Sequence, residues 1–169
     1  MDTLTVFGLQ FVFSLVVYAL LVKWYLMPWL AKKPVNQALI PLIIPHAFRY
    51  LGLAFLVPQL VAQPLPGSFA NAAAYGDFMS GLLALFSLLA LRASWRFSLP
   101  LVWLFNIVGA GDLINALHQA EVVPYFGTTW YIPTFVVPLL LVTHGLIFVR
   151  LFKELRPTLN SQTGETAEV

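Results

Sequence analysis

The second long apolar stretch of this chain, residues 38–62, carries three side chains that can do acid–base or binding chemistry. His46, Arg49 and Tyr50 are spaced by three and four positions, which places them on one face of an α-helix. A guanidinium at bilayer depth costs roughly 2.5–3.5 kcal/mol on insertion scales, and such groups usually face the protein interior beside a partner. We therefore expect Arg49 to point into a helical bundle and to meet a carboxylate there.

The fourth apolar stretch, residues 99–117, carries the densest polar pattern in the chain. Asn106, Asp112 and Asn115 fall within it, and the small residues 109–111 precede the acid. Small residues let a neighbouring helix approach closely. Asp77 lies only two residues from the start of the third span drawn below and is assigned to the outer side. Asp112 is then taken as the only acid deep inside another span, so the sequence predicts an Arg49–Asp112 ion pair.

The depths of these groups in the membrane are similar. At about 1.5 Å per residue, the polar positions of the second, fourth and fifth stretches fall within roughly 8–10 Å of one another along the bilayer normal. We therefore predict a binding site near the midplane, to which we also assign Tyr50. Its predicted residues are His46, Arg49, Tyr50, Asn106, Asp112, Asn115 and His144.

The predicted site favours binding or translocation of a small solute or of protons. Arginine and aspartate together are nearly neutral, and imidazoles titrate near physiological pH, so protonation of His46 or His144 could break and remake the ion pair. A purely structural salt bridge that sets helix order is the plainer interpretation, because buried pairs are weak evidence for stability.

Three other kinds of site use the same residues. A b-type haem would be held between His46 and His144, which lie on different helices at similar depth. A divalent metal would take Asp112 with these two histidines, or Asp112 with Asn115 and His118. Arg49 would repel such a cation, so we expect no metal.

An intramembrane enzyme acting on a lipid or isoprenoid would use histidine and aspartate as acid and base. The sequence has no HExxH and no glycine-rich phosphate loop, so we expect binding or transport rather than catalysis.

Composition identifies the elements that must position these side chains. Hydrophobic residues make up 60% of the 169 residues and charged residues only 9%, against about 25% charged residues in a soluble domain. The absence of cysteine excludes cysteine-ligated zinc, iron–sulfur clusters and disulfides. The few basic residues are scattered, so we expect no nucleic-acid partner. The lipid bilayer is the expected environment.

Five apolar stretches approach or exceed the roughly 20 residues needed to cross the hydrocarbon layer. Backbone polar groups must be satisfied inside that layer, so the stretches are predicted to be helices. The predicted fold class is an all-α integral membrane protein, a single five-helix domain over residues 1–156. Residues 157–169 are predicted to form a disordered tail. The predicted spans are residues 4–27, 38–62, 75–91, 99–117 and 130–152.

The basic residues predict the orientation. Apart from Arg49, they lie at the ends of the first, third and fifth spans or just after them, whereas Asp2, Asp77 and Glu121 lie towards the opposite side. The positive-inside rule therefore places the N-terminus outside and the C-terminus in the cytoplasm of an inner or plasma membrane. Five spans are few for a monomeric carrier, so we expect a homodimer. The basic residues are Lys23, Lys32, Lys33, Arg92, Arg96, Arg150, Lys153 and Arg156.

Overall fold

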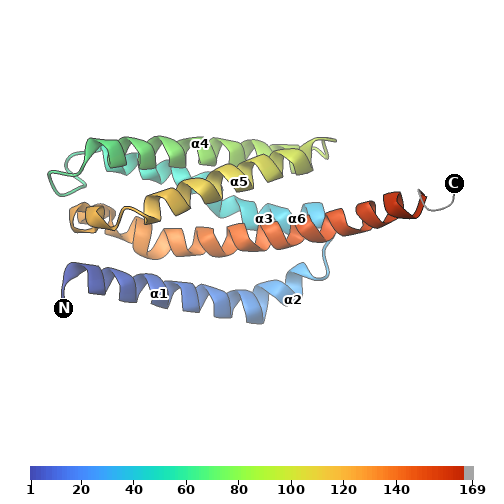
Figure 1. The fold of residues 1–169 in the computed structure, drawn as a ribbon, viewed down its shortest axis with the longest axis horizontal. Coiled ribbons are helices and arrows are strands. Elements are labelled where there is room, and N and C mark those ends of the chain that lie inside the picture. The colour runs from blue at the N-terminus through green and yellow to red at the C-terminus, as the bar shows by residue number, and fades with distance from the viewer. Residues whose placement is uncertain (166–169) are drawn as a thin grey trace.

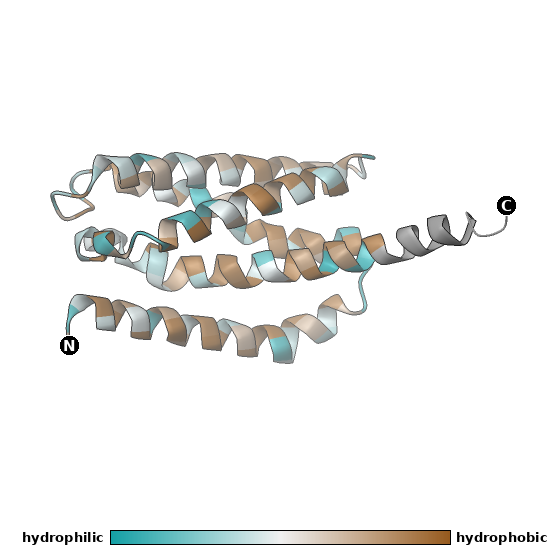
Figure 2. Cartoon of the chain, in the orientation of Figure 1, coloured by the Kyte–Doolittle hydropathy of each residue, from teal (hydrophilic) through white to brown (hydrophobic). Residues whose placement is uncertain are grey.

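The computed structural model describes the backbone of residues 1–165 and the side chains of residues 1–155, and this part of the chain is helical with no strand. Five helices are long and apolar enough to cross a membrane (Figures 1 and 2). This confirms the predicted all-α fold class with five potential spans. Their bounds are Thr3–Leu30, Val35–Leu56, Gly67–Arg92, Ser98–Leu117 and Gly127–Leu155.

The first span combines α1 (Thr3–Leu21), one π-helical turn η1 (Val22–Leu26) and α2 (Met27–Leu30). The sequence predicts that it ends before Pro28, and this is wrong. Pro28 follows directly after the π-helical turn η1, where the hydrogen-bond ladder already departs from the α-helical pattern, so the continuous helix accommodates the missing N–H. The span lies at one side of the bundle (Figure 1).

The second span changes helix type halfway. It begins as α3 (Val35–Ile43) and continues as a 3-10 helix, η2 (Ile44–Leu56). Pro41 and Pro45 lie around the change and lack the N–H that an α-helical ladder would use. A 3-10 helix has about three residues per turn, so its buried side chains follow a period of three: His46, Arg49, Gly52 and Phe55.

This change of helix type removes Tyr50 from the predicted face. Tyr50 follows Arg49 by one position, a rotation of about 120° in a 3-10 helix, and its side chain is 48% exposed. The span also ends at Leu56 rather than at residue 62.

The third and fourth spans are the α-helices α4 (Gly67–Arg92) and α5 (Ser98–Leu117). The predicted start of the third span, Tyr75, is too late. Residues 67–74 include four alanines, which favour helix, and Pro66 lies at the N-cap. Asp77 therefore lies well inside the helix rather than at its outer end, and Asp112 is not the only acid deep inside a span.

The fifth span begins with short irregular helices and ends as a long α-helix. The 3-10 helix η3 (Ala120–Tyr125) precedes it, and the span itself runs through η4 (Gly127–Trp130), a π-helical turn η5 (Ile132–Val136) and α6 (Val137–Glu165). The backbone of α6 thus extends into the segment predicted to be a disordered tail. Residues 166–169 lie outside the described residues, so the disorder of that tail stays a prediction.

Two apolar clusters occupy opposite ends of the bundle. We call one end the basic end, because the connections with Lys32, Lys33 and Arg96 lie there, and the other the N-terminal end (Figure 1). The basic-end cluster includes Leu39, Phe105 and Ile147. The N-terminal-end cluster is rich in aromatic rings: Phe55, Phe69 and Phe126 belong to it. A layer of polar side chains separates the two clusters.

Candidate functional site

Arg49 is the centre of the polar layer. Its side chain is almost fully buried, and its Nε and Nη2 atoms lie 2.7 Å from Asp77 Oδ1 and 2.5 Å from Asp112 Oδ2. Its Nη1 donates to the carbonyl oxygen of Gly109 at 3.0 Å. The predicted contact with Asp112 is present, but two acids bind the guanidinium instead of one. We call Arg49, Asp77 and Asp112 the charged triad.

Three glycines make room for the charged triad. A Cβ atom at Gly52 would overlap the Asp77 side chain, and one at Gly76 would overlap the Asp112 carboxyl group. A Cβ at Gly109 would lie 2.9 Å from Arg49 Nη1 and 2.9 Å from His144 Cε1. Each glycine lies on a different helix, so the helices approach one another through glycine at all three positions.

The rings of the two predicted histidines contact each other at a tilt of 54° on the other side of Gly109. The ring centroids of His46 and His144 are 4.1 Å apart, and the Phe105 ring packs against both. His46 Nε2 lies 2.9 Å from Thr143 Oγ1, and His144 Nδ1 lies 2.6 Å from Asn106 Oδ1. These contacts hold both rings in fixed orientations.

For neutral imidazoles, the hydrogen bonds assign which ring nitrogen carries the proton. Asn106 donates its Nδ2 to the His144 carbonyl at 3.3 Å, so its Oδ1 accepts from His144 Nδ1. The Thr143 hydroxyl donates within its own helix, so its oxygen accepts from His46 Nε2. This leaves His46 Nδ1 and His144 Nε2 as lone-pair acceptors, and neither has a partner among the described residues.

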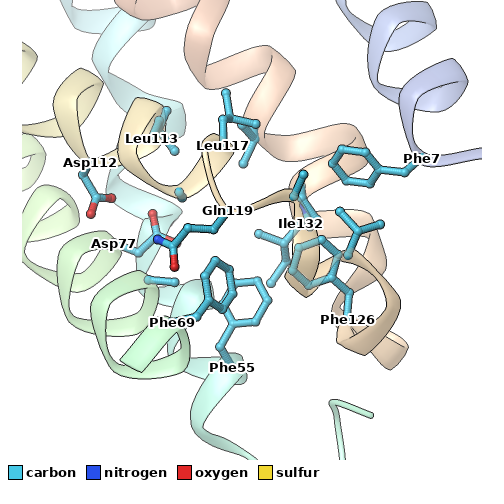
Figure 3. A pocket seen from close by; sticks show the side chains of 16 residues that line it. Phe7, Phe55, Phe69, Asp77, Asp112, Leu113, Leu117, Gln119, Phe126 and Ile132 are labelled. Atoms are coloured by element: carbon cyan, nitrogen blue, oxygen red, sulfur yellow. The ribbon is translucent and has the colours of Figure 1, made fainter. Parts of the chain in front are cut away.

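A cavity of about 70 Å³ leads from the carboxylates of the charged triad towards the N-terminal end. Asp77, Asp112 and Gln119 line it on one side, and Phe55, Phe69, Phe126 and Phe7 line it on the other (Figure 3). The Asp77 and Asp112 side chains are 12% and 19% exposed, whereas Arg49 is 1% exposed at its side chain. A molecule in the cavity would therefore meet the carboxylates first.

The structure brings together five of the seven predicted site residues. His46, Arg49, Asn106, Asp112 and His144 lie in the polar layer. Tyr50 and Asn115 are exposed and lie outside it. Asn115 is nine positions from Asn106, or two and a half turns of α-helix, so the two point in opposite directions.

Sequence reasoning missed Asp77, whose carboxylate completes the charged triad. The signal that could have found it is residues 70–74, four of them alanine, which favour helix and extend the third span towards the N-terminal end.

The residues present do not fit a haem or a metal. The His46 and His144 rings contact each other directly, which leaves no room for a macrocycle between them. Within the part of the chain that the structure describes, no three histidines and acids gather in a way that could hold a metal ion. His118, of the alternative metal set, bonds the Ile114 carbonyl of its own helix at 2.7 Å.

Five apolar helices around a charged layer define the class: a helical protein compatible with several membrane spans and with polar groups in its interior. Residues 6–152 match a family described as a domain of unknown function (DUF8737), and the chain belongs to that family. The match extends over all five helices. Searches of curated proteins and of solved structures found no match.

Proposed function

We propose that this protein binds a proton or a small solute at the charged triad and passes it across an inner or plasma membrane. One observation carries the proposal: two carboxylates share one guanidinium. In the fully ionised state the charged triad has a formal charge of −1. An uncompensated charge away from water costs several kcal/mol, so one carboxyl holds a proton or a cationic ligand lies beside it.

The exchangeable position is Asp112. Asp77 binds the Nε edge of Arg49 and is the more buried of the two acids, whereas Asp112 binds the Nη2 tip and is the more exposed. Both line the cavity. Because basic connections gather at the opposite end, the positive-inside rule places the cavity on the outer side of the membrane.

Infrared spectroscopy of the protein in vesicles tests the proton. We expect the C=O stretch of a protonated carboxyl at neutral pH in the wild type. Asp112→Asn and Asp77→Asn each make the charged triad neutral, so either change should remove the signal. Glu121→Gln, at the same end but outside the charged triad, should leave it intact. A wild-type protein without ligand that lacks the signal, or variants that keep it, would contradict the proposal.

Proton flux tests the passage across the membrane. Vesicles with an inside-negative potential and an internal pH dye should acidify faster with the wild-type protein than with Asp112→Asn. Equal rates for wild type, Asp112→Asn and protein-free vesicles would show that the site binds protons without passing them on.

A further inference from the structure

We infer that the cavity binds a small amphipathic organic monocation, a protonated amine with an apolar or aromatic body, in exchange for the proton of the charged triad. This inference rests on the proposed function and names the solute class. The structure supports it through three features of the cavity: the charge at its inner side, the aromatic carbon of its wall, and its size.

The inner side of the cavity selects for positive charge. Asp77 and Asp112 carry one negative charge more than Arg49 balances. All three nitrogens of the guanidinium already have partners: Nε on Asp77, Nη1 on the Gly109 carbonyl and Nη2 on Asp112. An anionic solute would therefore meet carboxylates without a free cation, whereas an ammonium group would neutralise the site.

The wall of the cavity selects for an apolar body. The rings of Phe55, Phe69 and Phe126 contact one another with centroids 5.7–6.0 Å apart, and Phe7 extends this surface from the first span. Aromatic faces attract organic cations and cover apolar groups. A small inorganic cation prefers several oxygen ligands. Away from the carboxylates the wall consists mainly of phenylalanine rings and aliphatic side chains, so it suits an organic cation better than a metal ion.

The size of the cavity limits the solute. One water needs roughly 10–15 Å³ of this kind of volume, so the observed 70 Å³ corresponds to about five to seven waters. Drug-sized ligands occupy pockets of about 300–1,000 Å³. A single-ring or short-chain amine is therefore the expected class.

The exchange balances in charge and in protons. The protonated site releases one H⁺ when the ammonium group binds, and the charged triad with its ligand is neutral before and after. No bond other than that to the exchanging proton forms or breaks. The inference therefore predicts one proton released for each amine bound.

Calorimetry of the full chain in lipid nanodiscs tests this, with benzylamine and its neutral analogue benzyl alcohol as probes. Titrations in two buffers with different ionisation enthalpies count the released protons. We expect benzylamine to bind at least about tenfold more tightly than benzyl alcohol, a difference of about 1.4 kcal/mol, with release of one proton. Asp112→Asn should remove this preference and the proton release.

Two phenylalanines of α4 form a matched pair for the wall. Phe69→Leu should weaken benzylamine binding several-fold, because Phe69 lines the cavity. Phe86→Leu should leave it unchanged, because Phe86 is exposed on the bundle surface.

Equal binding of the amine and the alcohol would mean that the cavity holds any apolar group, such as a lipid chain, and would overturn the inference. If the carboxyl infrared signal is present but benzylamine does not bind, the inference fails while the proposed proton site stands. If both are absent, both fail.

Discussion

The two ends of the bundle differ in how they fill the space beside the charged triad. At the basic end, aliphatic side chains and Phe105 pack until each is at most 3% exposed. At the N-terminal end, aromatic rings surround a cavity that reaches the carboxylates. The same five helices thus close the polar layer on one side and leave it accessible on the other.

The backbone explains this difference. The basic-end cluster is built from α-helices alone: α2, α3, α4, α5 and α6. Of the nine buried residues in the N-terminal-end cluster, three belong to α4, and the other six lie in η2, in η3 and in the connections between elements. Irregular backbone at membrane depth is tolerated where it is buried in protein or lines a cavity, and 3-10 segments in a longer helix often mark a hinge. Movement of a solute through the protein would therefore require the basic end to open.

The largest expected effect comes from removing Arg49, the cation in the polar layer between the two ends. Arg49→Leu leaves Asp77 and Asp112 buried without a counter-charge, which should cost about 3–5 kcal/mol of folding free energy. Thermal unfolding in detergent measures the loss. The triple variant with Asp77→Leu and Asp112→Leu should recover most of the stability and lack the infrared carboxyl signal. A stable Arg49→Leu protein would show that the charged triad does not hold the helices together.

A matched pair of leucine truncations measures the difference in packing directly. Leu39→Ala at the basic end removes a side chain that is 0% exposed and should cost about 2–5 kcal/mol. Leu117→Ala beside the cavity removes one that is 36% exposed and should cost less than about 1.5 kcal/mol. Equal losses in chemical denaturation would mean that the two ends are equally well packed.

Gly76→Ala should damage the cavity end alone. The added methyl would overlap the Asp112 carboxyl group and should cost about 1–3 kcal/mol through the required shift. It should also weaken proton and amine binding. Gly111→Ala is the control, because nothing lies within 4 Å of its added Cβ. If both variants behave like the wild type in thermal unfolding and in calorimetry, the close approach at Gly76 is not required.

The smallest effect concerns the cap of the first helix at the N-terminal end. Asp2 accepts hydrogen bonds from the Thr5 N–H and hydroxyl at 2.8 and 3.0 Å, and the backbone bond above all lowers the pKa of its carboxyl. A lowered pKa in the folded state means that the cap contributes at neutral pH and is lost as the pH falls through that pKa. NMR titration should find Asp2 below its ordinary pKa of 3.8, and Thr5→Ala should reduce the shift by removing the hydroxyl bond. A value at or above the ordinary one would contradict the cap.

Much of the fold and part of the site were predictable. Long apolar stretches and few charges are enough to predict five helices, and an isolated arginine inside one of them is enough to predict an acidic partner. Asp77 was missed because the predicted start of the third span lay only two residues before it, whereas the true start depends on alanine propensity rather than on hydropathy. Tyr50 was wrongly included because the offset of four residues from His46 shares a face only in an α-helix.

The sequence by itself determined the class of structure, a bundle of five long apolar helices. With 60% hydrophobic and 9% charged residues, the chain has too few polar side chains to cover a compact water-soluble fold. The sequence also predicted a carboxylate partner for Arg49, since an unpaired charge buried among apolar helices is costly. Tertiary structure alone decided which acids meet Arg49 and where space remains. Those outcomes depend on the rotation of η2 about its axis and on the distance at which glycines let helices approach, and both are set by the packing of neighbours far away in the sequence.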